Sequence, residues 1–301
     1  MRPELLDELW REQSVWSRTA NRMKARIERA RLGALLIVVA VALCATGATA
    51  LHGSAPVLGR VLAGAAALGS AVLPLLRPAW SGVRLKDWTR ARSVSEALKA
   101  DVYLWLAGAG PFADDPHAVV LRERTDRLRR DAADLMSQCA GVDPADRDLP
   151  AVHDLPSFFA VRVHGQYEDY YRAKVAFIAG RIRRFRLIEI GLGVLGAALG
   201  AAAAAFGASF AGWIAVLATA GTALSVHVSA TRYEFQLIEF SRTAEELRQI
   251  AVAAAADGIG ADELKALAVR AERVISVENQ GWMAKLAEDP PAQTAPEAGT
   301  P

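Results

Sequence analysis

The chain has 301 residues, of which 52% are hydrophobic and 23% are charged, and its formal net charge is +2. This nearly neutral charge gives no reason to expect a nucleic-acid partner. The two cysteines, Cys44 and Cys139, lie in an apolar run and in a polar stretch respectively, so we expect no disulfide framework and a reducing compartment.

The N-terminal third predicts a long helix that continues into an apolar hairpin. Residues 4–31 carry apolar side chains at helical spacing and contain neither proline nor glycine. Two apolar runs follow, 32–51 and 56–76, each close to the ~20 residues that cross ~30 Å of hydrocarbon. Ala48-Thr49-Ala50 has the form of a signal-peptide cleavage site, but the run exceeds the ~7–15 residues of a signal sequence. We therefore predict two retained membrane spans.

Polar segments connect this hairpin to the second half of the chain. Residues 78–86 predict a break, 87–106 a helix, 108–116 a turn and 117–139 another helix. The apolar positions of 117–139 alternate in steps of three and four over too few heptads for a convincing coiled coil, so we expect packing within the chain. The proline- and aspartate-rich residues 141–156 predict a linker.

The second half repeats the same order of elements. A basic helix over 162–186 leads into apolar runs 187–206 and 210–230, and a shift of 155 residues places Arg31 on Arg186. Helices are predicted over 232–256 and 261–287, and residues 288–301 have the composition of a disordered tail. The sequence thus predicts an all-α integral membrane protein with two tandem transmembrane helical hairpins, in modules 1–140 and 157–287.

Lysine and arginine flank both hairpins on the sides of the long helices, whereas the short loops 52–55 and 207–209 contain neither. The positive-inside rule therefore predicts a multi-pass protein with cytoplasmic helical extensions and with both termini in the cytoplasm. The cluster next to the spans could also bind anionic lipid headgroups. Our candidates for that role are Arg29, Arg31, Arg183, Arg184 and Arg186.

Polar side chains inside an apolar span are costly and need an explanation. In the fourth run, Thr219, Thr222, Ser225 and Ser229 fall within roughly a 120° arc at 100° per residue. Such a stripe lines a water-filled path or hydrogen-bonds a neighbouring helix, and we favour the second. Arg60, near the outer end of the second run, either reaches toward the interface or belongs to a ring of arginines at a pore mouth.

Motifs for catalysis or cofactor binding are missing. Residues 191–196 match G-x-G-x-x-G, but an arginine-rich helix precedes them and no acidic residue occurs between Glu189 and Glu234. We instead predict a close helix contact at Gly196 and Gly200. The histidines show no metal-ligand spacing. We expect neither an enzyme nor a cofactor.

Aromatic and charged residues before and after each hairpin carry a family resemblance. In the first module they are Trp16, Ala20-Asn21-Arg22, Lys24, Trp88, Arg92, Ser95-Glu96, Leu98-Lys99 and Pro111-Phe112. In the second they are Tyr167, Tyr170-Tyr171, Lys174, Arg232-Tyr233, Glu245-Glu246-Leu247, Val277-Glu278-Asn279-Gln280 and Trp282. In this order and spacing the chain resembles the SLATT family, the two-transmembrane effector domains of bacterial nucleotide-signalling conflict systems, present as a tandem pair.

The resemblance implies an effector in the bacterial inner membrane that serves antiphage defence. It would form a homo-oligomer in the lipid bilayer and open a pore, or otherwise perturb the membrane, after a signal. That signal would come from a separate nucleotide sensor or synthase. The alternative is a non-conducting scaffold that recruits a soluble partner through its cytoplasmic helices.

Overall fold

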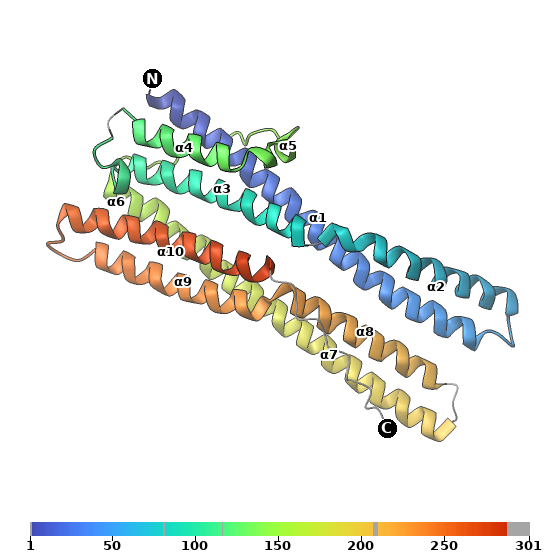
Figure 1. Ribbon diagram of the computed structural model, residues 1–301. Coiled ribbons are helices and arrows are strands. Elements are labelled where there is room, and N and C mark those ends of the chain that lie inside the picture. Colours follow the sequence, from blue (N-terminus) through green and yellow to red (C-terminus); the bar gives the residue numbers. More distant parts are fainter. Residues whose placement is uncertain (1, 81, 116, 207–209, 288–301) are drawn as a thin grey trace, which may run out of the picture.

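The computed structural model describes residues 2–80, 82–115, 117–206 and 210–287. Every regular element in these ranges is helical, and the chain is an all-α membrane protein as predicted (Figure 1). The predicted outer loop 207–209 and the predicted tail 288–301 lie outside the described residues. Residues 277–280 and Trp282 lie in a helix whose side chains beyond Ser276 are also outside them.

The first module is built on one unbroken helix. α1 (Arg2–Ala50) runs from the polar extension into the first span, which confirms the predicted continuous helix. After a short turn α2 (Pro56–Leu76) returns alongside it, beginning at a proline in the position where its fixed φ suits a helix start. The 3-10 turn η1 (Arg77–Trp80) then leads into α3 (Gly82–Leu106), which packs on the polar part of α1.

The prediction of a single helix over residues 117–139 was wrong. After the 3-10 turn η2 (Gly110–Phe112), α4 (Val119–Asp131) begins where the Asp115 carboxylate accepts hydrogen bonds from the backbone N–H groups of Val119 and Leu121, at 2.7 and 3.2 Å. It ends at Asp131, and after Ala132 the chain continues in η3 (Ala133–Leu135) and α5 (Met136–Cys139). The predicted packing within the chain is confirmed, because α4 contacts α3 and α5 contacts α1.

The second module repeats the long helix. α6 (Leu155–Phe158), the π-helical turns η4 (Phe159–His164) and η5 (Gln166–Arg172), and α7 (Ala173–Phe206) follow one another along a single rod. Asp154 and Ser157 form a capping box at its start. α8 (Ala211–Thr231) returns beside α7, and α9 (Tyr233–Ala254) and α10 (Ala261–Ala287) complete the module.

The two modules lie side by side, with both hairpins at the same end of the molecule (Figure 1). α1 of the first module contacts α8 of the second, and α3 of the first contacts α10 of the second. The two modules are therefore joined both along the hairpins and along the polar helices. We call residues 32–76 and 187–231 the apolar half and the remaining described residues the polar half. The polar half contains the largest part of the core, including Trp16, Leu98, Leu121, Phe158 and Leu247, each at most 1% exposed.

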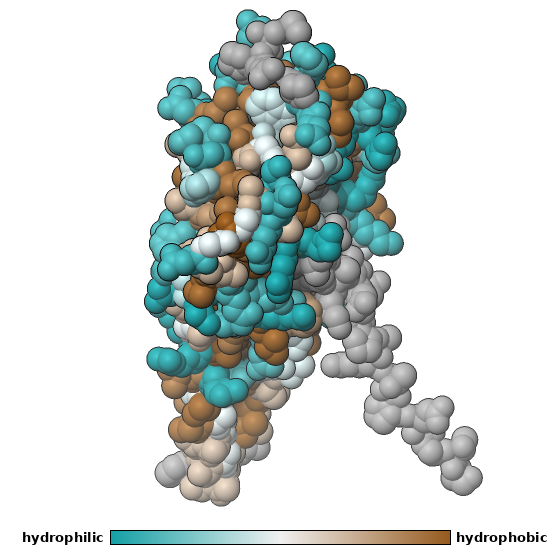
Figure 2. Space-filling view, turned by 90° about the vertical axis from the view of Figure 1, so that its left-hand side faces the viewer, coloured by the Kyte–Doolittle hydropathy of each residue, from teal (hydrophilic) through white to brown (hydrophobic). Residues whose placement is uncertain are grey.

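The apolar half exposes its side chains instead of burying them. Among the described residues, four helices are long and apolar enough to cross a membrane. Leu68 and Leu75 of α2 and Leu187 and Val194 of α7 are each more than 60% exposed. A helix surface with so many exposed leucine and valine side chains is stable in the hydrocarbon core of a lipid bilayer. Figure 2 shows the molecule from the end opposite the hairpins, where hydrophilic side chains cover much of the surface.

The segment between the modules is held along α1. Residues 141–152, which we call the strap, contain no helix, yet the Trp10 indole N–H donates to the Asp148 carbonyl at 2.8 Å. Arg18 donates to the Asp143 carbonyl at 2.8 Å, and the Ala145 N–H donates to the Ser14 hydroxyl at 2.8 Å. The strap therefore fixes the path by which the chain passes from one module to the next.

Candidate functional site

The polar stripe of α8 faces away from the rest of the chain. Val216 and Leu224, which are buried, mark the face that packs on α1 and α7. At 100° per residue the stripe lies on the opposite side of the helix, and Thr222, Ser225 and Ser229 are exposed. The Thr219 hydroxyl donates to the Ala215 carbonyl of its own helix at 2.8 Å. Within the described residues the stripe thus does not join α8 to another helix of the same chain.

Arg60 and the predicted contact glycines also point outward. Arg60 is exposed, and its Nε donates to the Pro56 carbonyl of its own helix at 3.3 Å. A Cβ added at Gly196 or Gly200 would meet nothing within 4 Å, so neither glycine makes a close helix contact inside the chain. Their role in a contact with another copy stays a prediction.

The close helix contacts inside the chain use glycines other than Gly196 and Gly200. A Cβ added at Gly69 on α2 would lie 2.6 Å from Val41 Cγ2 on α1. One added at Gly212 on α8 would lie 3.0 Å from Thr46 Cγ2, where the two hairpins meet. These glycines allow α1 to approach both neighbours, and the apolar runs alone gave no signal for which glycines would do so.

The juxtamembrane arginines separate into two groups. Arg183, Arg184 and Arg186 are exposed on α7. Arg29 and Arg31 instead line a cleft of about 460 Å³ between the modules, and Arg31 donates to the Ala230 carbonyl of α8 at 3.3 Å. The cleft lies where the polar half meets the apolar half, because its lining includes Leu32 and Leu35 as well as Lys24 and Lys174.

A buried ion pair within the second module packs against α3 of the first module in the polar half. Arg162 of η4 donates two hydrogen bonds to Glu272 of α10, at 2.6 and 2.8 Å, and the two side chains are 1% and 5% exposed. The Arg162 guanidinium carbon lies 4.7 Å from the centre of the Tyr103 ring on α3. Burial alone would lower the pKa of Arg162, but the Glu272 carboxylate raises it above its ordinary value. This pair was missed because its members are 110 residues apart.

Charged side chains of α3 surround the same pair. Glu96 lies 2.7 Å from Arg92 and 3.9 Å from Lys99. Burial, followed by the positive charge of Arg162, lowers the pKa of Lys99 to about 8. The carboxyl of Glu96 has a pKa below its ordinary value: burial opposes this shift, but Lys99, Arg92 and Arg162 outweigh it.

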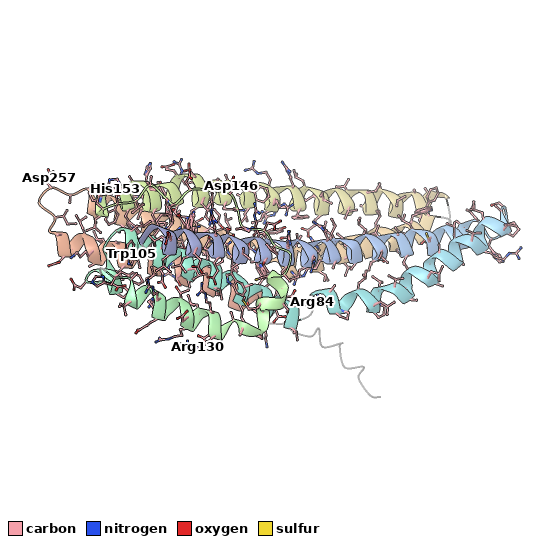
Figure 3. All side chains as sticks on the ribbon, turned by 90° about the horizontal axis from the view of Figure 1, so that it is seen from above. Arg84, Trp105, Arg130, Asp146, His153 and Asp257 are labelled. Atoms are coloured by element: carbon pink, nitrogen blue, oxygen red, sulfur yellow. The ribbon has the colours of Figure 1, made fainter. Side chains whose placement is uncertain are left out.

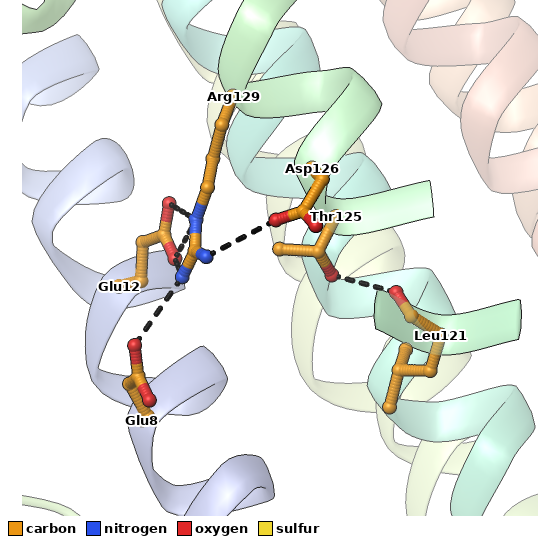
Figure 4. A network of polar contacts seen from close by, with 6 residues as sticks. All are labelled: Glu8, Glu12, Leu121, Thr125, Asp126 and Arg129. Carbon is orange, nitrogen blue, oxygen red and sulfur yellow. Dashed lines mark hydrogen bonds and ion pairs between the residues drawn. The ribbon is translucent and has the colours of Figure 1, made fainter. Parts of the chain in front are cut away.

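A second, more exposed network fastens α4 to α1 (Figure 4). The Arg129 guanidinium donates to the Glu12 carboxylate at 2.6 Å and lies 3.4 Å from Glu8. Polar side chains are concentrated around these helices, whereas Arg84 marks the approach to the apolar half (Figure 3). Over the residues that the structure describes, no group of His, Cys, Asp or Glu side chains is arranged to hold a metal ion.

Comparison with known families assigns the two modules separately. Residues 158–282 match the family of SMODS and SLOG-associating 2TM effector domain 1, and residues 14–119 match the DUF4231 family. Neither the curated proteins nor the solved structures that were compared gave a match. The first match spans the helical rod, the hairpin and the two helices that follow it, which is the architecture described above. The second module therefore matches the SLATT family, the SMODS and SLOG-associating two-transmembrane effector domains, over residues 158–282.

Proposed function

We propose that this protein is an effector of a bacterial conflict system that assembles in the inner membrane and makes it permeable. The family match supports a membrane effector of such systems. We also infer that the first module is a diverged second copy of the same unit, because it has the same order of long helix, hairpin and returning helix. The trigger would come from a separate nucleotide sensor or synthase.

The outward stripe of α8 is the observation that supports assembly. Its hydroxyls lie opposite the face that packs on α1 and α7, so one copy encloses no path along them. Hydroxyl groups in hydrocarbon are stabilised most by hydrogen bonds to another helix or to water. Both partners become available if α8 helices of several copies face one another. The stripe would then line the space between the copies.

Orientation follows from the charges that flank the spans. Arg29, Arg31, Arg183, Arg184 and Arg186 all lie at the boundary between the polar and apolar halves, on the side of the polar half. The positive-inside rule places this side in the cytoplasm. The polar half would then be cytoplasmic, with both termini, and only the hairpin loops would face outward.

Two assays test this proposal. The first follows a membrane-potential dye in bacteria during inducible expression, and the second measures dye leakage from liposomes. The triple variant Thr222→Val, Ser225→Ala, Ser229→Ala removes three exposed hydroxyls. At about 0.6 kcal/mol for each interhelical hydrogen bond, leakage should fall by roughly twentyfold. Ser70→Ala on α2 is the control, because the Ser70 hydroxyl bonds its own helix at the Ala66 carbonyl. Wild-type protein that stays monomeric and causes no leakage would contradict the proposal.

The scaffold is the second candidate, because α9 exposes apolar side chains in the polar half. Ile238 and Val252 are 63% and 62% exposed there, where a soluble partner could cover them. Toxicity that survives in the triple α8 variant but disappears in Ile238→Ser, Val252→Ser would favour this function over permeation. The opposite result would exclude the scaffold.

A further inference from the structure

The cleft between the modules gathers positive charge from helices that are distant in the sequence. Its cations come from α1 (Lys24, Arg29 and Arg31) and from α7 (Lys174 and Arg181). Among the described residues its one lining carboxylate is Glu28, 3.8 Å from Lys24. All of these cations except Arg31 are exposed, and Arg31 is half-buried. The excess of cations over acids is therefore accessible from solvent.

The electrostatics of the cleft disfavour an empty state. Like charges on facing helices repel one another, and the apolar side chains that line the cleft lower the local dielectric constant and strengthen the repulsion. The pKa of Lys24 is lowered, chiefly because the ammonium group is partly buried; Glu28 opposes the shift, and the positive charges of Lys174, Arg92 and Arg181 make smaller contributions that lower it. An anion between α1 and α7 would reverse the sign of these interactions.

Aromatic side chains form the rest of the wall. On α7, Phe177, Arg181 and Phe185 follow one another at four-residue steps and so share one face of the helix. Phe185 stacks on Tyr233 with ring centres 5.8 Å apart, and Arg181 donates to the Tyr233 hydroxyl at 2.7 Å. The Arg181 guanidinium is thereby fixed beside two aromatic rings, with Phe177 at 5.2 Å. Guanidinium groups held in this way suit the planar, bidentate recognition of phosphate.

We propose that this cleft binds a phosphate ester whose phosphate lies among Lys24, Lys174 and Arg181 and whose apolar or planar part lies against Phe177 and Phe185. Leu32 and Leu35 extend the lining toward the apolar half, so the ester could be an anionic lipid headgroup that enters from the membrane. A soluble nucleotide that enters from the aqueous side has the same chemistry. The site goes beyond the proposed permeation function and does not require it.

Calorimetric titration of the full-length protein in a neutral detergent separates the two sources. One arm uses ATP, and the other uses dihexanoyl phosphatidylglycerol below its micelle concentration, with dihexanoyl phosphatidylcholine as the zwitterionic reference. We expect saturable binding in one arm, which identifies the source. No binding in either arm would overturn the proposal.

A matched pair of double variants tests the position of the site. Lys174→Gln, Arg181→Gln removes two cleft cations and should raise the dissociation constant at least tenfold. Arg183→Gln, Arg184→Gln removes the same charge from exposed positions of the same helix that do not line the cleft, and should change it less than twofold. Equal losses in both variants would refute a specific site in the cleft.

Two further variants distinguish loss of charge from loss of structure. Tyr233→Phe removes the hydrogen bond to Arg181 and keeps every cation, so binding should stay within threefold of wild type. Arg181→Lys keeps the charge and should bind more tightly than Arg181→Gln. The proposal would be contradicted if Tyr233→Phe weakened binding more than threefold. It would also be contradicted if Arg181→Lys bound no more tightly than Arg181→Gln. Because none of these measurements uses leakage, a protein without pore activity could still bind, and the two proposals fail independently.

Discussion

Arg162 and Glu272 show how one pair of residues joins the second module internally and against α3. Arg162 lies within Phe-Phe-Ala-Val-Arg-Val at the start of the predicted basic helix, and this local pattern does not show whether its side chain is buried. Its partner could not be predicted, because periodicity within a helix carries no information about contacts 110 residues away. Arg129 with Glu8 and Glu12 escaped prediction for the same reason.

Replacing one member of the buried pair should be worse than replacing both. Arg162→Met or Glu272→Met leaves an unpaired buried charge and should cost about 3–5 kcal/mol, whereas the double Met variant should cost less than either single. Unfolding of the detergent-solubilised protein, followed by circular dichroism, measures this. The exposed pair Arg242 and Glu246, 3.1 Å apart, is the control, and its loss should cost at most about 0.5 kcal/mol. Additive costs at Arg162 and Glu272 would contradict the coupling.

Lys99 should make stability depend on pH above neutrality. Its pKa is about 8 in the folded protein and 10.5 for an ordinary lysine, so the unfolded chain binds more protons between these values. Stability therefore rises with pH over this window, by up to about 3 kcal/mol, as the penalty for a buried charge disappears. Lys99→Met should remove the rise. Parallel pH profiles of unfolding midpoints for both proteins, from pH 7 to 10.5, would show the inference to be wrong.

At the scale of the element, the helices that could be predicted were those with a continuous pattern. α1, α2, α8 and α10 follow apolar runs or helical periodicity, which local sequence encodes. The break of residues 117–139 at Ala132 was not predicted, because the apolar spacing continues across the turn that leads to α5, which contacts α1. Gly196 and Gly200 fit a contact motif, yet the contacts inside the chain form at Gly69 and Gly212.

Two glycines on α2 should respond differently to a methyl group. A Cβ at Gly69 would lie 2.6 Å from Val41, so Gly69→Ala should force the first hairpin apart and cost about 1–3 kcal/mol. Gly64 has nothing within 4 Å of that position, so Gly64→Ala should be neutral or stabilise α2 by up to about 1 kcal/mol. Thermal unfolding in detergent compares them. Similar midpoints would mean that α1 and α2 are not packed as described.

At the scale of the whole molecule, the number of candidate spans could be predicted, but the arrangement of the helices could not. Apolar runs identify four spans because the bilayer fixes their length. The contact of α1 with α8 and of α3 with α10 depends on surfaces from both modules, which no local pattern specifies. The cleft exists only because the modules pack in this way. Arg29 and Arg31 could be proposed as lipid ligands because they lie next to a span in the sequence. Lys174 and Arg181 could not, because only the packing brings them to the cleft.

The proposed topology predicts which turns a reagent reaches from outside the cell. In a background with Cys44→Ala and Cys139→Ala, Ser54→Cys lies in the exposed turn between α1 and α2. Asp257→Cys lies at the opposite end of the molecule (Figure 3). A membrane-impermeant maleimide should label Ser54→Cys in intact spheroplasts and Asp257→Cys only after lysis. The reverse result would invert the orientation.

The strap has a consequence for how copies of the protein can combine. Residues 143–148 are fastened to α1 by Trp10, Ser14 and Arg18, so the polypeptide that enters α6 is tethered beside its own first module. Tethering keeps the effective concentration of one module near the other far above that of any second molecule. Exchange of modules between neighbours by domain swapping is thereby disfavoured. Any higher-order association would have to engage surfaces that each monomer leaves uncovered.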